Sequence, residues 1–137
     1  MSVIRNALIS LGAFWLSLWA AWIFQLPSYD KLINAVVRDE TVLTAVAMGV
    51  LSSTGRTLAA ILAGILVTLI VSGRKPELWA LIVAVLYVVD APVRHHWGYP
   101  ATAWDRLWQS VDLVFPAVSC LIAALLTAYF RRKRSRS

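Results

Sequence analysis

Charged residues are scarce in this sequence, and their scarcity excludes an ordinary soluble domain. Only 15% of the 137 residues are Asp, Glu, Lys or Arg, whereas 60% are hydrophobic. Soluble domains carry about 25% charged and roughly 45–50% apolar residues. The hydrophobic residues lie in long runs, which is the pattern of helices that cross a membrane.

Cysteine and histidine are almost absent as well, which limits metal and redox chemistry. The single cysteine, Cys120, cannot form an internal disulfide, and we expect it to pack within the last apolar run. His95 and His96 are adjacent, whereas a tetrahedral metal site needs four ligands of suitable geometry, so an exposed loop is favoured over a metal pair. No phosphate-binding loop, nucleophile elbow or paired-carboxylate motif is present. We therefore predict that the chain is not an enzyme and holds no cofactor and no metal.

Apolar segments account for almost the whole chain. A helix needs about 20 residues to cross a bilayer core of roughly 30 Å. We expect spans near residues 4–26, 51–72 and 77–93, and a last span that begins near Trp104 or Trp108, runs to Phe130 and is kinked at Pro116. The second apolar run starts earlier, at residue 42, so it either tilts and protrudes or bends near Gly55.

The polar stretch 28–41 contains apolar residues at helical spacing, which favours a short amphipathic helix in the membrane interface. The predicted fold is therefore an all-α polytopic integral membrane protein with about four transmembrane helices and one interfacial helix. Residues 1–130 form a single domain in this interpretation, and residues 131–137 form a basic cytoplasmic tail.

The net charge of +6 does not indicate nucleic-acid binding, because the positive charge gathers at the end of the chain. A basic cluster directly after a hydrophobic helix is the usual anchor to anionic lipid headgroups. The anchor residues that we predict are Arg131, Arg132, Lys133 and Arg134. A tail that binds a particular lipid or protein is the alternative.

The distribution of charge between the loops predicts orientation. With four spans, Arg5, Arg74, Lys75 and the tail share one side, and Glu77 is the acidic residue there. The opposite side holds most of the carboxylates. By the positive-inside rule we expect both termini in the cytoplasm of a multi-pass protein of the bacterial-type inner membrane.

Three ionisable residues fall within or at the edge of the spans: Arg56, Asp90 and Asp112. Such residues are costly in lipid and mark functional sites by default. Counting residues along each helix places all three in the outer half of the membrane. One interpretation is an ion pair between Arg56 and an aspartate that holds helices together, since a buried charge demands a partner. The other is a site for an ion or a substrate.

Part of the sequence resembles a known family of transporters. Leu26-Pro27-Ser28, the amphipathic stretch, Ser53-x-Gly55-Arg56-x-Leu58-Ala59 and Gly73-Arg74-Lys75 follow one another. This order resembles the N-terminal part of ABC importer permeases of the nitrate/sulfonate/taurine type, over about residues 15–75. Tyr29 and Ala60 depart from the proline and the glycine of the family pattern, and no Glu-Ala-Ala loop for an ATPase follows.

These observations favour a transport-related, permease-like membrane subunit. Four short helices bury little polar lining alone, so we expect a homo-oligomer or a complex with other membrane subunits in the lipid bilayer. A holin-like pore-forming protein is the alternative, because it too would be small and sparsely charged with a basic tail.

Overall fold

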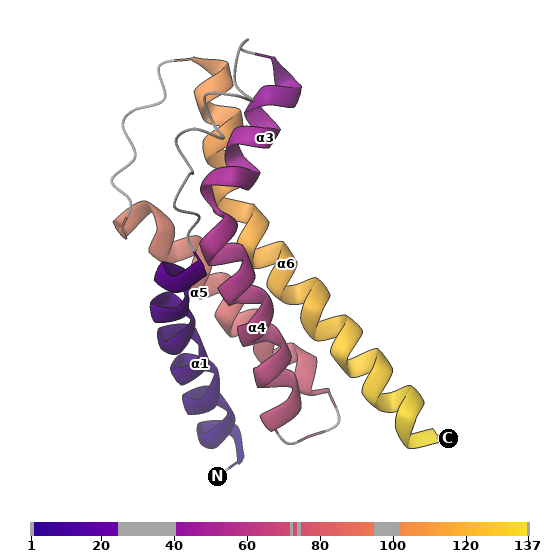
Figure 1. Ribbon diagram of the computed structural model, residues 1–137. Coiled ribbons are helices and arrows are strands. Elements are labelled where there is room, and N and C mark those ends of the chain that lie inside the picture. The colour runs from indigo at the N-terminus through magenta and orange to yellow at the C-terminus, as the bar shows by residue number, and fades with distance from the viewer. Residues whose placement is uncertain (1, 25–40, 72, 74, 95–101, 137) are drawn as a thin grey trace.

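Every regular element that the structure describes is helical. The computed structural model describes residues 2–24, 41–71, 73, 75–94 and 102–136 (Figure 1). The elements are α1 (Ser2–Phe24), α3 (Val42–Ser52), α4 (Thr54–Ile70), the 3-10 helix η1 (Pro76–Trp79), α5 (Ala80–Arg94) and α6 (Ala103–Arg136). The all-α class predicted from the sequence is confirmed for these ranges. The predicted interfacial helix, apart from Thr41, and the pair His95–His96 lie outside the described residues.

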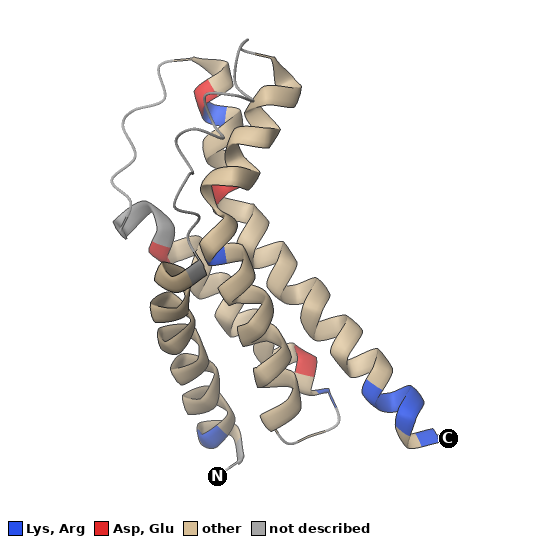
Figure 2. Ribbon diagram, viewed as in Figure 1, with Lys and Arg blue, Asp and Glu red and all other residues tan. Residues whose placement is uncertain are grey.

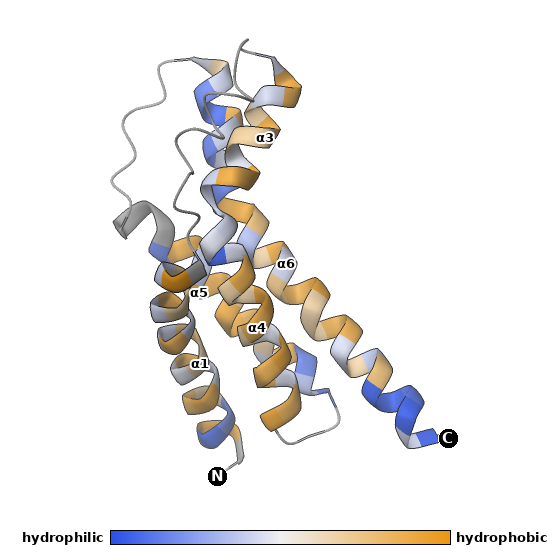
Figure 3. Cartoon of the chain, in the orientation of Figure 1, coloured by the Kyte–Doolittle hydropathy of each residue, from blue (hydrophilic) through white to orange (hydrophobic). Residues whose placement is uncertain are grey.

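Two helices are long and apolar enough to cross a membrane, within α1 over Val3–Ile23 and over the whole of α6. The bent pair α3–α4 provides a third candidate if it is counted as one span. Figure 3 shows hydrophobic residues around all of the helices. The chain is therefore compatible with a multi-pass membrane protein.

Large apolar side chains cover the outside of α1. Trp15, Trp19 and Trp22 are 56%, 74% and 83% exposed. A water-soluble monomer rarely exposes a continuous apolar patch of this kind, whereas lipid tails would cover it at no cost. The tryptophan stripe thus lies on a face that the other described helices leave open.

The second apolar run bends at Ser53. Helices α3 and α4 meet there at 62°, two residues before Gly55, so of the two alternatives that the sequence left open the run bends. Ser53 donates a hydroxyl hydrogen bond to the Gly49 carbonyl, and Thr54 donates to the carbonyls of Val50 and Leu51. Hydroxyl groups that bond back to the preceding turn bend helices, which accounts for the break.

Small residues allow the bent run to approach α6 closely. Buried positions recur on α6 at every fourth residue: Asp112, Pro116, Cys120, Ala124 and Ala128. A Cβ atom added at Gly64 of α4 would lie 2.5 Å from the Cys120 carbonyl oxygen. At Gly49 of α3, an added Cβ would lie 2.7 Å from the Trp108 carbonyl oxygen. Close backbone contact through small residues is how helices associate in lipid.

Helix α1 is joined to α5 by an aromatic and a polar contact. The Phe14 and Tyr87 rings pack edge to face with centroids 5.3 Å apart. The Ser17 hydroxyl and the Tyr87 phenol share a hydrogen bond of 2.6 Å. This contact satisfies the polar end of a fully buried tyrosine.

Helix α6 does not end where the apolar run ends. The sequence predicts a helix to residue 130 and then a tail, but α6 continues to Arg136. The N-terminus, the α4–η1 connection and the C-terminal end of α6 lie at the same end of the molecule (Figure 1). The continued helix therefore holds the basic residues against the ends of α4 and η1.

Candidate functional site: a buried ion pair beside a helix break

The centre of the site is an ion pair between α4 and α6. Arg56 Nη2 lies 2.6 Å from Asp112 Oδ2, and the two side chains are 10% and 3% exposed. Arg56 is in the first turn of α4, where the helix dipole is positive. The guanidinium therefore gains nothing from its own helix, and the Asp112 carboxylate is the group that compensates its charge.

The second oxygen of the carboxylate is also occupied. Ser52, the last residue of α3, donates a hydrogen bond of 2.5 Å to Asp112 Oδ1. Three elements thus meet at one carboxylate: the end of α3, the start of α4 and the middle of α6. The helix break at Ser53 is what brings Ser52 and Arg56 to the same acidic side chain.

Pro116 prepares a further acceptor for Arg56. A proline within a helix has no N–H, so the carbonyl four residues earlier loses its usual hydrogen bond. For Pro116 that carbonyl belongs to Asp112, and Arg56 Nη2 donates to it at 3.4 Å. Arg56 therefore contacts both the side chain and the freed backbone carbonyl of Asp112.

One nitrogen of the guanidinium is left over. Arg56 Nη1 is buried and has no hydrogen-bond partner within the part of the chain that the structure describes. A buried donor without an acceptor costs about 1–3 kcal/mol, and more when it is charged. The site thus holds an unused, charged hydrogen-bond donor beside a fully occupied carboxylate.

The structure brings together two of the three ionisable residues that the sequence singles out. Arg56 contacts Asp112, whereas Asp90 lies on α5, where its side chain is half-buried. The sequence interpretation missed the parts played by Ser52 and Pro116. The signal for Pro116 was available, because a proline four residues after an intramembrane aspartate frees that residue's carbonyl.

The basic end of α6 forms a second polar region. Arg131 Nη1 donates to the carbonyls of Thr68 and Leu69 at 3.1 and 3.4 Å, at the end of α4. Arg132 Nη2 lies 2.7 Å from Glu77 Oε1 in η1. Two of the four predicted headgroup anchors therefore also tie α6 to its neighbours, and all four are exposed.

Glu77 is ionised more easily than a free glutamate. Burial by itself would raise the pKa of Glu77, but the hydrogen bond from Arg132 and the positive charges of Arg132 and Lys75 outweigh burial and lower it. The carboxylate at this end of the molecule therefore stays charged to more acidic pH than usual.

Metal ligands do not gather in the described ranges. No group of three or more His, Cys, Asp or Glu side chains there is placed to hold a metal ion. No protein family, curated protein or solved structure matches the chain. The described residues of the site offer a carboxylate that accepts hydrogen bonds and a guanidinium whose unused buried donor can bind an anion.

Proposed function

We propose that this chain is a small inner-membrane protein with four helical crossings and both termini in the cytoplasm. In this proposal it works as a transport-related subunit, as an oligomer or with other membrane subunits. The observation that carries the proposal is the buried Arg56–Asp112 pair, set where an apolar helix is interrupted. Interrupted helices and intramembrane charges mark ion and substrate pathways in transporters.

The length of the α5 region supports a fourth crossing. Glu77 stays on the cytoplasmic side in this proposal, so the crossing begins at Leu78: two residues of η1 rise about 2 Å each and the 15 residues of α5 about 1.5 Å each. Together they reach about 27 Å, which is close to the roughly 30 Å of a bilayer core. Neither element meets the length of a span alone, but the two in sequence do.

The charges support the orientation. In Figure 2 basic residues colour the end of the molecule that holds both termini, whereas the opposite end carries mixed charge. Arg5, Lys75 and the end of α6 contribute this positive charge. Short basic segments stay in the cytoplasm, so this end is the cytoplasmic one in the proposal.

Reporter fusions test the orientation. A reporter that is active only in the cytoplasm should be active after Ser137 and inactive when it is inserted at Gly98. Activity at Gly98 together with inactivity after Ser137 would overturn the proposed topology.

Gentle purification tests the role as a subunit. The full chain is extracted in mild detergent and its mass is measured by native mass spectrometry. We expect two or more copies, or companion membrane chains. A monomer without companions contradicts the proposal, and so does collapse of the membrane potential on overexpression, which is the behaviour of a holin-like pore.

A double variant tests the role of the ion pair. Arg56→Gln with Asp112→Asn removes both charges and leaves no buried charge unpaired. We expect this variant to assemble like the wild type. Transport by the proposed oligomer, or by its complex with other membrane subunits, should be lost. Retained transport would reduce the pair to a structural contact.

A further inference from the structure

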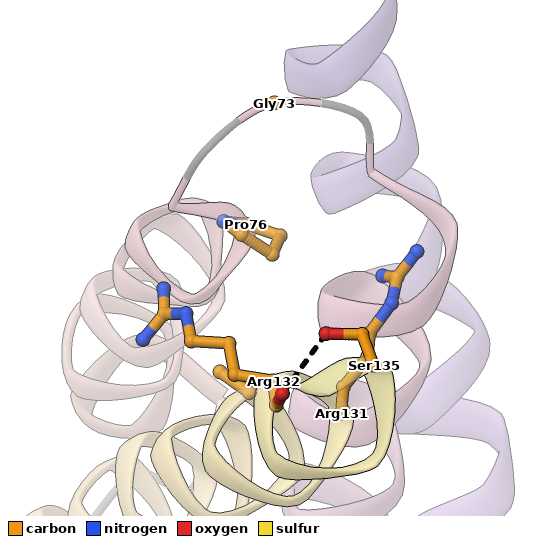
Figure 4. A pocket seen from close by; sticks show the side chains of 6 residues that line it. Gly73, Pro76, Arg131, Arg132 and Ser135 are labelled. Atoms are coloured by element: carbon orange, nitrogen blue, oxygen red, sulfur yellow. Dashed lines mark hydrogen bonds between the residues drawn. The ribbon is translucent and has the colours of Figure 1, made fainter. Parts of the chain in front are cut away.

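A cavity lies at the basic end of the molecule, between the α4–η1 connection and the last turns of α6. It has a volume of about 220 Å³ and is lined by Gly73, Pro76, Ala128, Arg131, Arg132 and Ser135. This space is many times what a single water molecule needs. We call it the Arg131–Arg132 pocket (Figure 4).

The two arginines flank the pocket and are held in place. In Figure 4 the Arg131 side chain extends toward α4 and the Arg132 side chain toward η1, with the Pro76 ring between them. Arg131 is fixed through Nη1 by the Thr68 and Leu69 carbonyls, and Arg132 by Glu77. Guanidinium groups that are already ordered lose little entropy when they bind an anion.

The contacts of Arg131 and Arg132 within the protein do not neutralise the positive charge of the pocket. The partners of Arg131 are carbonyl groups, whose helix end carries about half a negative charge. Glu77 balances Arg132, but Lys75 and the exposed residues Lys133 and Arg136 add positive charge nearby. The pocket therefore has a net positive surrounding, which suits an oxyanion.

The pocket also has an open mouth. Gly73 has φ +134°, a conformation that side chains rarely adopt, and an added Cβ there would meet nothing within 4 Å. Ser135 is exposed at the other rim, where its hydroxyl donates to the Arg132 carbonyl. A ligand can therefore enter from the surface without displacing a core side chain.

We infer that the Arg131–Arg132 pocket binds one anionic phosphoryl group. Arginine binds phosphate oxygens through its planar fork of donors, and basic pockets between helices at the cytoplasmic face bind lipid headgroups. A phospholipid headgroup and free phosphate both present this group. The inference is independent of the transport role, because the pocket shares no residue with the Arg56–Asp112 pair.

The test uses the full chain, purified in mild detergent and stripped of lipid. Phosphatidylglycerol, phosphatidylcholine and inorganic phosphate are added separately, and bound molecules are counted by native mass spectrometry. We expect saturation at one phosphatidylglycerol per chain. If inorganic phosphate binds equally and competes, the source of the phosphoryl group is the free ion; if it does not, the source is the lipid.

Two variants change the pocket without removing charge. Ser135→Leu fills the rim, and Arg131→Lys keeps the charge but loses the planar fork. Each should weaken binding about tenfold, Ser135→Leu because the leucine side chain occupies the space of the ligand and Arg131→Lys because charge-assisted hydrogen bonds are lost. Ser135 is exposed, so Ser135→Leu should melt at the wild-type temperature without lipid.

Lys133→Gln is the matched control. It removes one positive charge beside the pocket but does not line it. We expect this control to weaken binding less than either pocket variant. The inference would be overturned if Lys133→Gln and Ser135→Leu weakened binding equally, or if binding never saturated. Either result would mean that the lipid is attracted by positive charge in general and does not bind in the pocket.

Discussion

The ion pairs Arg56–Asp112 and Arg132–Glu77 both fasten α6 to other helices, and they differ in surroundings rather than in geometry. The N–O distance is 2.6 Å for Arg56–Asp112 and 2.7 Å for Arg132–Glu77. Both carboxylates are buried, with side chains 3% and 9% exposed, whereas the arginine side chain is 10% exposed in the first pair and 48% exposed in the second. At equal distance, the environment decides what the loss of one partner costs.

The reason is whether water can solvate the arginine when its carboxylate partner is lost. An exposed arginine without its partner is solvated by water, so a surface pair contributes about 0–1 kcal/mol. A buried arginine without its partner stays desolvated, and breaking such a pair costs about 3–5 kcal/mol. We therefore expect loss of the carboxylate to be costly in the pair near the helix break and tolerated in the pair at the basic end.

The largest effect should come from Asp112→Ala. It leaves the Arg56 guanidinium buried without its counter-charge, so the free energy of unfolding should fall by about 3–5 kcal/mol. Titration of the purified protein with SDS measures this change.

Adding Arg56→Gln to Asp112→Ala should restore part of the lost stability, since no buried charge remains. A double variant that is less stable than Asp112→Ala alone would show that Arg56 contributes through other contacts.

The next largest effect should come from Gly64→Ala. The added Cβ would meet the Cys120 carbonyl at 2.5 Å, so α4 must move away from α6. Overpacking of this kind costs about 1–3 kcal/mol. Gly12→Ala is the control, because its added Cβ meets nothing within 4 Å. If both variants unfold alike, close approach of α4 and α6 does not hold the buried pair together.

Pro116→Ala should have a smaller and more selective effect. Alanine supplies the missing N–H, which competes with Arg56 for the Asp112 carbonyl. The coupling energy between Arg56 and Asp112 in a double-mutant cycle should fall by about 0.5–1.5 kcal/mol, the worth of one hydrogen bond. An unchanged coupling energy would mean that the carbonyl contact contributes nothing.

Glu77→Gln should have the smallest effect, at most about 1 kcal/mol, and salt should erase it. Because the pKa of Glu77 is lowered in the folded protein, its contribution is present above the ordinary value of 4.5. It is lost as pH falls through the lowered folded value. Unfolding of the wild type and of Glu77→Gln at low and neutral pH should therefore converge in acid, and a difference that persists there would contradict this assignment.

Helices were predictable from the sequence because the backbone of a long apolar run in a membrane satisfies its hydrogen bonds within a helix. The first predicted span is helical over its described residues to Phe24, and the break at Ser53 falls near Gly55, where a bend was one of the two alternatives. The extent of α6 was not predictable in the same way. Arg131–Arg136 carry no apolar signal, and their helix is supported by contacts with residues more than 50 positions away.

The candidate site was predictable only in part. The rule that a buried charge needs a partner led from Arg56 to a carboxylate, but the choice of Asp112 over Asp90 depends on how the helices pack. The role of Ser52 depends on the 62° bend, whose angle the sequence does not encode locally. Orientation in the membrane and the interfacial helix stay predictions.

The continuation of α6 beyond the apolar run matters to anyone who trims the protein for expression. On sequence alone, a stop codon after Phe130 removes only a polar appendage. In the structure it also removes Arg131, which caps the end of α4, and Arg132, which holds η1. A shortened gene would thus yield a chain in which the end of α4 and η1 are no longer bonded to α6. Affinity tags are therefore better placed after Ser137.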